Sequence, residues 1–324
     1  MSATWIGLAA LAVALAWPVP ILLSRARWPA RAPGTALLVW EAIALAGGLS
    51  MIGALLSYGL QPFGATFIDG LLAVPRYLLE RRLPATADFG QMFALSGGVL
   101  LAIHLLLNLA LTAVRAERSR TRHRQLVTLL STPMPQRPGL RLIDHQAPVA
   151  YCLPGTTRSV TVLSAGLLEL LDETQLRAVI SHENAHAAQR HHLVLLAFRA
   201  WSRSLPWFPI ATRALVEVAT LVEMLADDRA RQEVSDDALA QSIALVASAS
   251  GASAVGARTP DFLRTAPDAA ANALAADGDS AHRRIARLVG SSRPLGIQAR
   301  LFAVGCSVAL LAVPTALLVY HAFQ

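Results

Sequence analysis

Long apolar runs alternate along the chain with polar stretches rich in arginine. A helix needs about 20 apolar residues to cross a bilayer, and four runs reach that length: residues 3–24, 34–60, 91–114 and 297–320. Each run predicts a transmembrane helix. In the first run the positive charges follow the apolar core, whereas a signal peptide carries them before it. We therefore expect this helix to be a transmembrane helix that is not cleaved off as a signal peptide.

The region between the third and fourth runs shows shorter patterns. Residues 149–153 and 159–163 are apolar stretches joined by a proline-glycine turn, which predicts a pair of strands. Asp172 and Gln175 have the spacing of a capping box, so a helix should begin there and run through His186. Further helices are predicted over residues 210–232, from Ser235 onward and over 280–289, with a loop over 251–268.

Together these patterns predict a mainly α membrane protein with four transmembrane helices and one α+β domain. The membrane domain covers residues 1–114, the α+β domain 115–296, and the fourth helix with a short terminus 297–324. The positive-inside rule places the α+β domain in the cytoplasm and both termini outside the plasma membrane. The arginines that decide this flank the spans: Arg25, Arg27, Arg31, Arg115, Arg118, Arg120, Arg122, Arg124, Arg283, Arg284, Arg287 and Arg293.

Composition agrees with a membrane protein. The chain is 54% hydrophobic and 15% charged, outside the usual balance of soluble proteins. All 28 basic residues are arginine, which excludes sites that need lysine, such as a P-loop or an S-x-x-K acylation site. The arginines lie beside apolar spans, where anionic lipid explains them, so the bilayer is the expected partner and direct binding of nucleic acid is not expected.

A histidine-rich stretch, ISHENAHAAQRHH, carries the clearest candidate chemistry. It places His182, Glu183 and His186 in the order H-E-x-x-H. On a helix, residues four apart lie on one face and about 6 Å apart along the axis, so the two imidazoles can point at one zinc ion. A hydrolytic zinc site needs a third protein ligand and one open position. The alternative is a pair of buried histidines on a core helix.

The helix predicted over residues 210–232 contains a second pattern, E-x-x-x-D. Its apolar neighbours make an unpaired carboxylate at Glu223 costly to bury, so Glu223 is the candidate third ligand. Asp227, one turn later, could accept a hydrogen bond from the far nitrogen of a ligating imidazole. The alternative is a solvated acidic face.

These motifs, with the segments AYCLPGTTRSVTVLSAGLLELLDETQLRAVISHENAH, LPWFP and EMLAD, resemble the membrane metallopeptidases of the BlaR/MecR type. They are similar, more distantly, to HtpX-like membrane proteases. The resemblance implies a zincin-like domain in which His182, His186 and Glu223 bind zinc and Glu183 is the catalytic base. It also implies Asp227 as a supporting residue behind the ligands.

The resemblance does not extend to the sensor domain of BlaR/MecR receptors, because the chain ends at Gln324 and contains no lysine for the acylation motif. It therefore implies a membrane zinc endopeptidase that cleaves a cytosolic protein, such as a winged-helix repressor of the BlaI type, or its own chain. The alternatives are a quality-control protease of the HtpX type and a zinc-dependent scaffold without catalysis. An extended substrate is expected to add as a strand beside Ser159, Val160, Thr161, Val162 and Leu163.

Several polar residues outside these motifs give weaker predictions. His282 or Arg284 could stabilise an oxyanion, although a basic run flanking the membrane is the favoured interpretation of that segment. His191 lies five residues after His186, off the ligand face, and both it and His192 are predicted to lie at the surface or at an interface. The polar residues Glu41 and Asn108 lie at similar depths, so we expect the second and third spans to touch there.

Overall fold

The computed structural model describes residues 2–135, 137–153, 160–205, 209–256, 278–290 and 294–319. The chain divides into two compact units. The first comprises Met1–Leu109, Arg203–Ala214 and Leu295–Gln324, and the second comprises Ala110–Ser202 and Leu215–Pro294.

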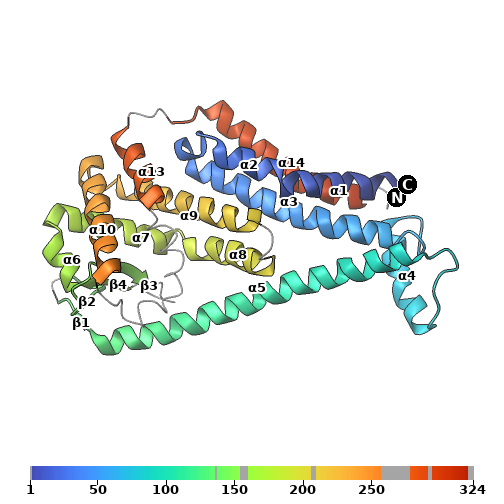
Figure 1. Ribbon diagram of the computed structural model, residues 1–324, viewed down its shortest axis with the longest axis horizontal. Helices are drawn as coiled ribbons and strands as arrows, with labels where there is room; N and C mark the ends of the chain where they lie inside the picture. The colour runs from blue at the N-terminus through green and yellow to red at the C-terminus, as the bar shows by residue number, and fades with distance from the viewer. Residues whose placement is uncertain are drawn as a thin grey trace. The chain divides into compact units, whose positions relative to one another are not determined.

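Apolar helices make up the first unit. They are α1 (Ser2–Ala16), α2 (Pro18–Arg25), α3 (Pro33–Gly59), α4 (Phe67–Leu79), the first half of α5 (Phe89–Leu130) and α14 (Ile297–Val319). Helices α1, α3 and α14 pack side by side (Figure 1). Four segments are long and apolar enough to cross a membrane, namely Thr4–Arg25, Pro33–Gly59, Phe89–Leu130 and Ile297–Val319. They agree with the four predicted runs and indicate a membrane-associated protein.

Two features of these helices were not predicted. The first span is divided between α1 and α2 at Pro18, because proline cannot donate the backbone hydrogen bond that a continuous helix needs. Helix α5 continues beyond the predicted end of the third span at Val114 and reaches Leu130. Its second half is rich in arginine and leucine, which are strong helix formers, and no glycine or proline interrupts it.

Asn108 has a different partner from the one predicted. Its side-chain nitrogen donates to the hydroxyl of Ser204 at 2.7 Å, and the Nε2 atom of His104 lies 3.2 Å from the carbonyl of the same serine. Helices α3 and α5 instead approach each other where Gly59 faces Leu95. The expected contact between Glu41 and Asn108 is therefore wrong, because the segment that begins at Arg203 provides the polar partner.

A four-stranded sheet lies in the second unit. Its strands are β1 (Ser131–Pro133), β2 (Leu140–Ile143), β3 (Ala150–Leu153) and β4 (Val160–Ser164), in the order β1-β2-β4-β3. Strand β4 pairs parallel with β2 and antiparallel with β3. The β3–β4 pair was predicted, whereas β1 and β2 were not. The predicted turn between β3 and β4 lies outside the described residues.

The described helices that follow the sheet form the rest of the domain. They are α6 (Ala165–Leu170), α7 (Glu173–Ala188), α8 (His191–Ser204), α9 (Pro209–Ala230), α10 (Asp236–Gly256) and α13 (Gly278–Val289), with α8 and α9 extending into the first unit. Helices α7, α9 and α13 confirm their predictions to within a few residues. Helix α10 reaches Gly256, so the loop predicted from residue 251 does not begin there, and its remainder lies outside the described residues.

A small apolar cluster holds α7, α9, α10 and α13 together. Its members are each at most 6% exposed: Ala178, Ala230, Leu239, Ala240 and Leu288. The small alanine side chains on α7 and α9 let these two helices approach closely. The cluster therefore fixes the relative positions of the helices that carry the candidate motifs.

The start of α7 depends on the predicted capping box. The Asp172 carboxylate accepts hydrogen bonds from the backbone N–H groups of Thr174 and Gln175, both at 2.8 Å. The Gln175 side chain accepts from the Asp172 N–H at 3.1 Å. We expect Asp172→Ala to lower the free energy of unfolding by about 1 kcal/mol, measured by urea titration in detergent. Glu169→Ala, an exposed position on α6, is the control, and an equal loss there would contradict a capping role.

Candidate metal centre

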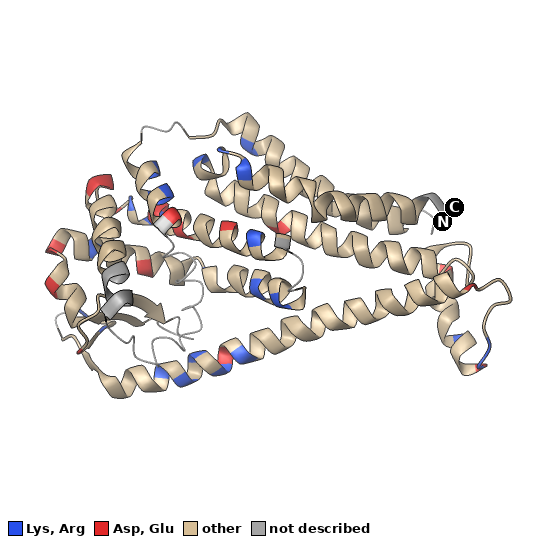
Figure 2. Ribbon diagram, viewed as in Figure 1, with Lys and Arg blue, Asp and Glu red and all other residues tan. Residues whose placement is uncertain are grey.

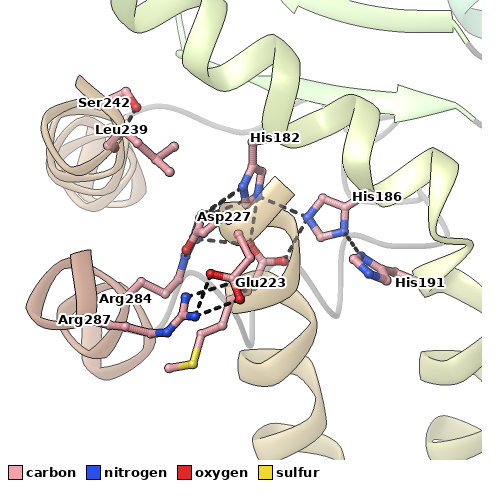
Figure 3. A network of polar contacts seen from close by, with 11 residues as sticks. His182, His186, His191, Glu223, Asp227, Leu239, Ser242, Arg284 and Arg287 are labelled. Atoms are coloured by element: carbon pink, nitrogen blue, oxygen red, sulfur yellow. Dashed lines mark hydrogen bonds and ion pairs between the residues drawn. The ribbon is translucent and has the colours of Figure 1, made fainter. Parts of the chain in front are cut away.

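Helix α7 presents His182 and His186 on one face, one helical turn apart, as the H-E-x-x-H spacing predicts. The His182 ring is buried and the His186 ring is partly buried. Figure 3 shows both imidazoles pointing toward Glu223, which comes from α9. The structure therefore brings the three predicted ligands together.

Helix α9 holds Glu223 and Asp227 inside the domain, because apolar residues surround both in the sequence of this helix. Val218, Leu221, Val222, Met224 and Ala226 are each at most 2% exposed. Asp227 is only 1% exposed, and one of its carboxylate oxygens lies 2.9 Å from Nδ1 of His182. An aspartate in such surroundings must be paired, and the imidazole N–H is one of its partners. This contact leaves Nε2 of His182 to face Glu223.

The spacing of the three side chains fits a zinc ion. Nε2 of His182 lies 3.1 Å from Nε2 of His186 and 3.2 Å from a Glu223 oxygen, and Nε2 of His186 lies 3.4 Å from the other Glu223 oxygen. Ligand atoms about 2.1 Å from a tetrahedral zinc ion are about 3.4 Å apart. All three ligand atoms lie within 4.8 Å of one another. The donor set of two imidazoles and one carboxylate is one that zinc accepts.

The charge of the site also suits a divalent cation. The site holds three carboxylates and one guanidinium: Glu183, Glu223, Asp227 and Arg284. Once metal binding has removed the proton of His182, Glu223 and Asp227 against Arg284 leave a surplus of one negative charge, and an ionised Glu183 adds a second. Electrostatic attraction would therefore favour an ion with two positive charges.

Burial and pairing shift the ionisation of these groups. Burial by itself lowers the pKa of His182, but hydrogen bonds with Asp227 and Glu223 raise that pKa to about 9. Burial acts to raise the pKa of Glu223, but His186 and Arg284 hold that pKa well below its usual value. The pKa of Asp227 is likewise lowered, against the effect of burial, by Arg284. Glu223 and Asp227 are therefore both ionised, which suits Glu223 as a metal ligand and Asp227 as the acceptor of the His182 N–H.

Glu183 follows His182 on α7 and faces the sheet. Burial raises the pKa of its carboxyl, although the nearby imidazoles and a hydrogen bond from the backbone N–H of Cys152 partly offset this effect. Cys152 belongs to β3, so this hydrogen bond places the carboxylate beside that strand. A carboxyl with a raised pKa next to a metal site is suited to accept and return a proton.

Arg284 is the central cation of the site. Its guanidinium donates to both oxygens of Asp227, at 2.7 and 2.8 Å, and lies 3.0 Å from Glu223. Only 9% of the residue is exposed. Arg284 therefore links α13 to α9 through a bidentate ion pair with Asp227. The role predicted for Arg284 as an oxyanion-stabilising group stays a prediction. His282 is exposed, and among the described residues it forms no hydrogen bond or ion pair with the residues of this site.

Two other arginines of α13 pair with α9 as well. Arg283 donates to Glu217 at 3.2 Å, and Arg287 donates to both oxygens of Asp228, at 2.6 and 2.7 Å. Figure 2 shows the basic residues of α13 and the acidic residues of α9 on these two helices. The arginines therefore neutralise a neighbouring helix, a role that the sequence did not predict, while the interpretation of this segment as a basic run flanking the membrane stays a prediction. Arg293 lies outside the described residues.

His191 is also placed differently from its prediction. The residue is 3% exposed, and its Nδ1 atom lies 3.0 Å from Nδ1 of His186. The prediction continued the helix of His186 beyond its true end. Helix α7 ends at Ala188, and Arg190 has a positive φ of 51°, so the chain turns and α8 begins with His191 beside His186.

The predicted substrate strand is not available for pairing. Strand β4 hydrogen bonds with β2 on one side and β3 on the other, so a peptide cannot add beside Val160, Thr161, Val162 or Leu163. Ser159 lies outside the described residues. Among the described strands, β3 is the terminal one on this side of the sheet. The prediction chose the inner strand because alternation of apolar residues does not reveal the order of strands.

Two imidazoles one turn apart and a glutamate from a second helix form a donor set that zinc accepts. A further glutamate, Glu183, follows the first imidazole in the chain, and this arrangement is typical of a metal-dependent hydrolase. The model of the family described as Peptidase family M48 matches residues 113–303, more than half of the 324-residue chain. The chain therefore belongs to peptidase family M48, a family of metal-dependent peptidases that usually bind zinc. No match to a solved structure was found.

Proposed function

We propose that this protein is a membrane zinc endopeptidase in which His182, His186 and Glu223 bind the metal. The observation that supports it most is the convergence of these three side chains from two helices within 4.8 Å. Zinc at this position would lower the pKa of a bound water and polarise a peptide carbonyl. Asp227 holds His182 through Nδ1, so that Nε2 carries the lone pair that a metal needs.

Glu183 is the catalytic base in this proposal. Its carboxylate oxygen accepts a proton from the attacking water and then delivers that proton to the departing amine. Two features of the chain support the role. Burial raises the affinity of the carboxyl for a proton, and the Cys152 N–H holds the carboxylate beside the metal ligands.

An extended substrate would add to the outer edge of β3. The N–H of Ser164 donates to the carbonyl of Val149, so Val149 faces β4 and, by alternation, the N–H groups of Ala150 and Cys152 point away from β4. The Cys152 N–H contacts Glu183, which brings this edge next to the proposed base. Backbone hydrogen bonds along the edge would fix the register of a substrate.

Ala150→Pro tests the edge. Proline removes the outward N–H of this residue without removing a hydrogen bond to β4, so cleavage of a protein substrate should fall at least about tenfold with zinc affinity unchanged. The measurement is the initial rate of cleavage beside zinc titration of the same preparation. Cleavage at the rate of the original protein would contradict substrate addition at β3.

The substrate is proposed to be a cytosolic regulatory protein, for example a winged-helix repressor, or the chain itself. This proposal rests on the resemblance to BlaR/MecR-type peptidases and on the positive-inside rule. Five arginines between Arg115 and Arg124 follow the third apolar segment and favour the cytoplasmic side for that end. A quality-control role of the HtpX type is the alternative within the same family.

Mass spectrometry of newly formed peptide termini tests the substrate class. Membranes and cytosol from cells that express the protein would be compared with the same fractions from cells that express Glu183→Gln. A few termini in one soluble regulatory protein support the proposal. Many termini spread over damaged membrane proteins would support the quality-control alternative, and no difference would support a scaffold without catalysis.

A further inference from the structure

His191 lies directly behind His186, on the side away from the other metal ligands (Figure 3). The two Nδ1 atoms are 3.0 Å apart. On its other side, Nε2 of His191 lies 2.7 Å from the side-chain oxygen of Gln189. Gln189, His191 and His186 thus form one chain of hydrogen bonds that ends at Nε2 of His186.

The positions of the protons in these hydrogen bonds follow from the group at one end, the side-chain amide of Gln189. The amide oxygen of Gln189 can only accept, so the proton of the first hydrogen bond belongs to Nε2 of His191. A neutral His191 then has a lone pair on Nδ1, and the proton between the two rings belongs to Nδ1 of His186. A neutral His186 in turn has its lone pair on Nε2, the atom that faces His182 and Glu223.

We propose that His191, oriented by Gln189, is a positioning residue that fixes the tautomer and the ring orientation of His186 for metal binding. The inference rests on the proposed zinc site. It also assigns the two proposed imidazole ligands different supports: a carboxylate, Asp227, behind His182, and a neutral imidazole behind His186. A neutral support adds no further negative charge to a site that already holds three carboxyl groups and one guanidinium.

The backbone between α7 and α8 makes this arrangement possible. Gln189 is the C-cap of α7, Arg190 has a φ of 51°, and His191 begins α8. Because the chain turns at Arg190 and does not continue as one helix, the imidazole of His191 can lie next to the imidazole of His186. His191 is 3% exposed, which keeps water from replacing it as the acceptor.

Zinc affinity tests the inference without any measurement of proteolysis. The variants are His191→Phe, which keeps an aromatic ring but has no acceptor, and His191→Asn, whose side-chain oxygen can accept from Nδ1 of His186. Competition with a chromophoric chelator should show zinc binding weakened about 10- to 100-fold in His191→Phe. His191→Asn should bind more tightly than His191→Phe. His282→Phe, which alters an exposed histidine on α13, should bind like the original protein.

Nitrogen NMR of the original protein, labelled with ¹⁵N in histidine, provides a second measurement that does not depend on the folding of a variant. We expect directly attached protons on Nδ1 of His186 and on Nε2 of His191, in both the zinc-free and zinc-loaded protein. A proton on Nε2 of His186 in the zinc-free protein, or on Nδ1 of His191 in either form, would overturn the inference.

Equal zinc affinity of His191→Phe and the original protein would also overturn it. Failure of the proposed function looks different: the original protein itself would then bind no zinc in the titration. The tautomer of His186 would still be readable by NMR in that case, so the two failures are distinguishable.

Discussion

Replacing Glu183 with glutamine should lower kcat/KM for proteolysis about 10²- to 10⁴-fold and leave zinc bound. Glutamine keeps the size of the side chain and can still accept a hydrogen bond from the Cys152 N–H, but its amide cannot take a proton from water. The three proposed ligands are unchanged. The measurement is the rate of substrate cleavage together with the zinc content of the purified variant.

Glu169→Gln is the matched control, because it makes the same chemical change at an exposed position of α6. Its rate should equal that of the original protein. A Glu183→Gln variant that cleaves at the original rate would remove Glu183 from the mechanism. A variant that loses zinc as well as activity would instead assign Glu183 a role in holding the site together.

Replacing Arg284 with methionine should have the largest effect on stability. The change leaves Asp227, which is 1% exposed, without the guanidinium that contacts both of its oxygens. Removing one partner of a buried ion pair costs about 3 to 5 kcal/mol, because the other charge stays buried. Urea titration of the zinc-free protein in detergent would measure the loss.

Two comparisons sharpen this prediction. Arg231→Met breaks an ion pair with Asp236 in which both side chains are at least 35% exposed, and it should cost at most about 1 kcal/mol. Adding Asp227→Asn to Arg284→Met should recover part of the loss, since no unpaired buried charge is then left. If Arg284→Met and Arg231→Met lose the same stability, the buried pair does not hold α13 against α9.

The helices that carry the site were predictable because their signals are local. The capping box at Asp172 and the H-E-x-x-H spacing both depend on residues within one or two turns of a helix. Glu223 and Asp227 stood out because carboxylates in an apolar helix need partners. The convergence of α7 and α9 on one point was implied by this chemistry and by the family resemblance, not by any local pattern.

The surroundings of the site were not predictable in the same way. His191 returned to His186 only because Arg190 adopts a left-handed conformation, for which arginine gives no sequence signal. The order of strands in the sheet made β3 and not β4 the accessible edge, and periodicity cannot reveal that order. The pairing of α13 with α9 had a usable signal. Three arginines within five residues of α13 pair with the four acidic residues of α9.

The most direct test of the central claim is an anomalous difference map, at the zinc absorption edge, from crystals of the zinc-loaded protein. We predict one strong peak about 2.0–2.2 Å from Nε2 of His182, Nε2 of His186 and a carboxylate oxygen of Glu223. A peak elsewhere in the molecule, or a Glu223 side chain turned away from both imidazoles, would contradict the account.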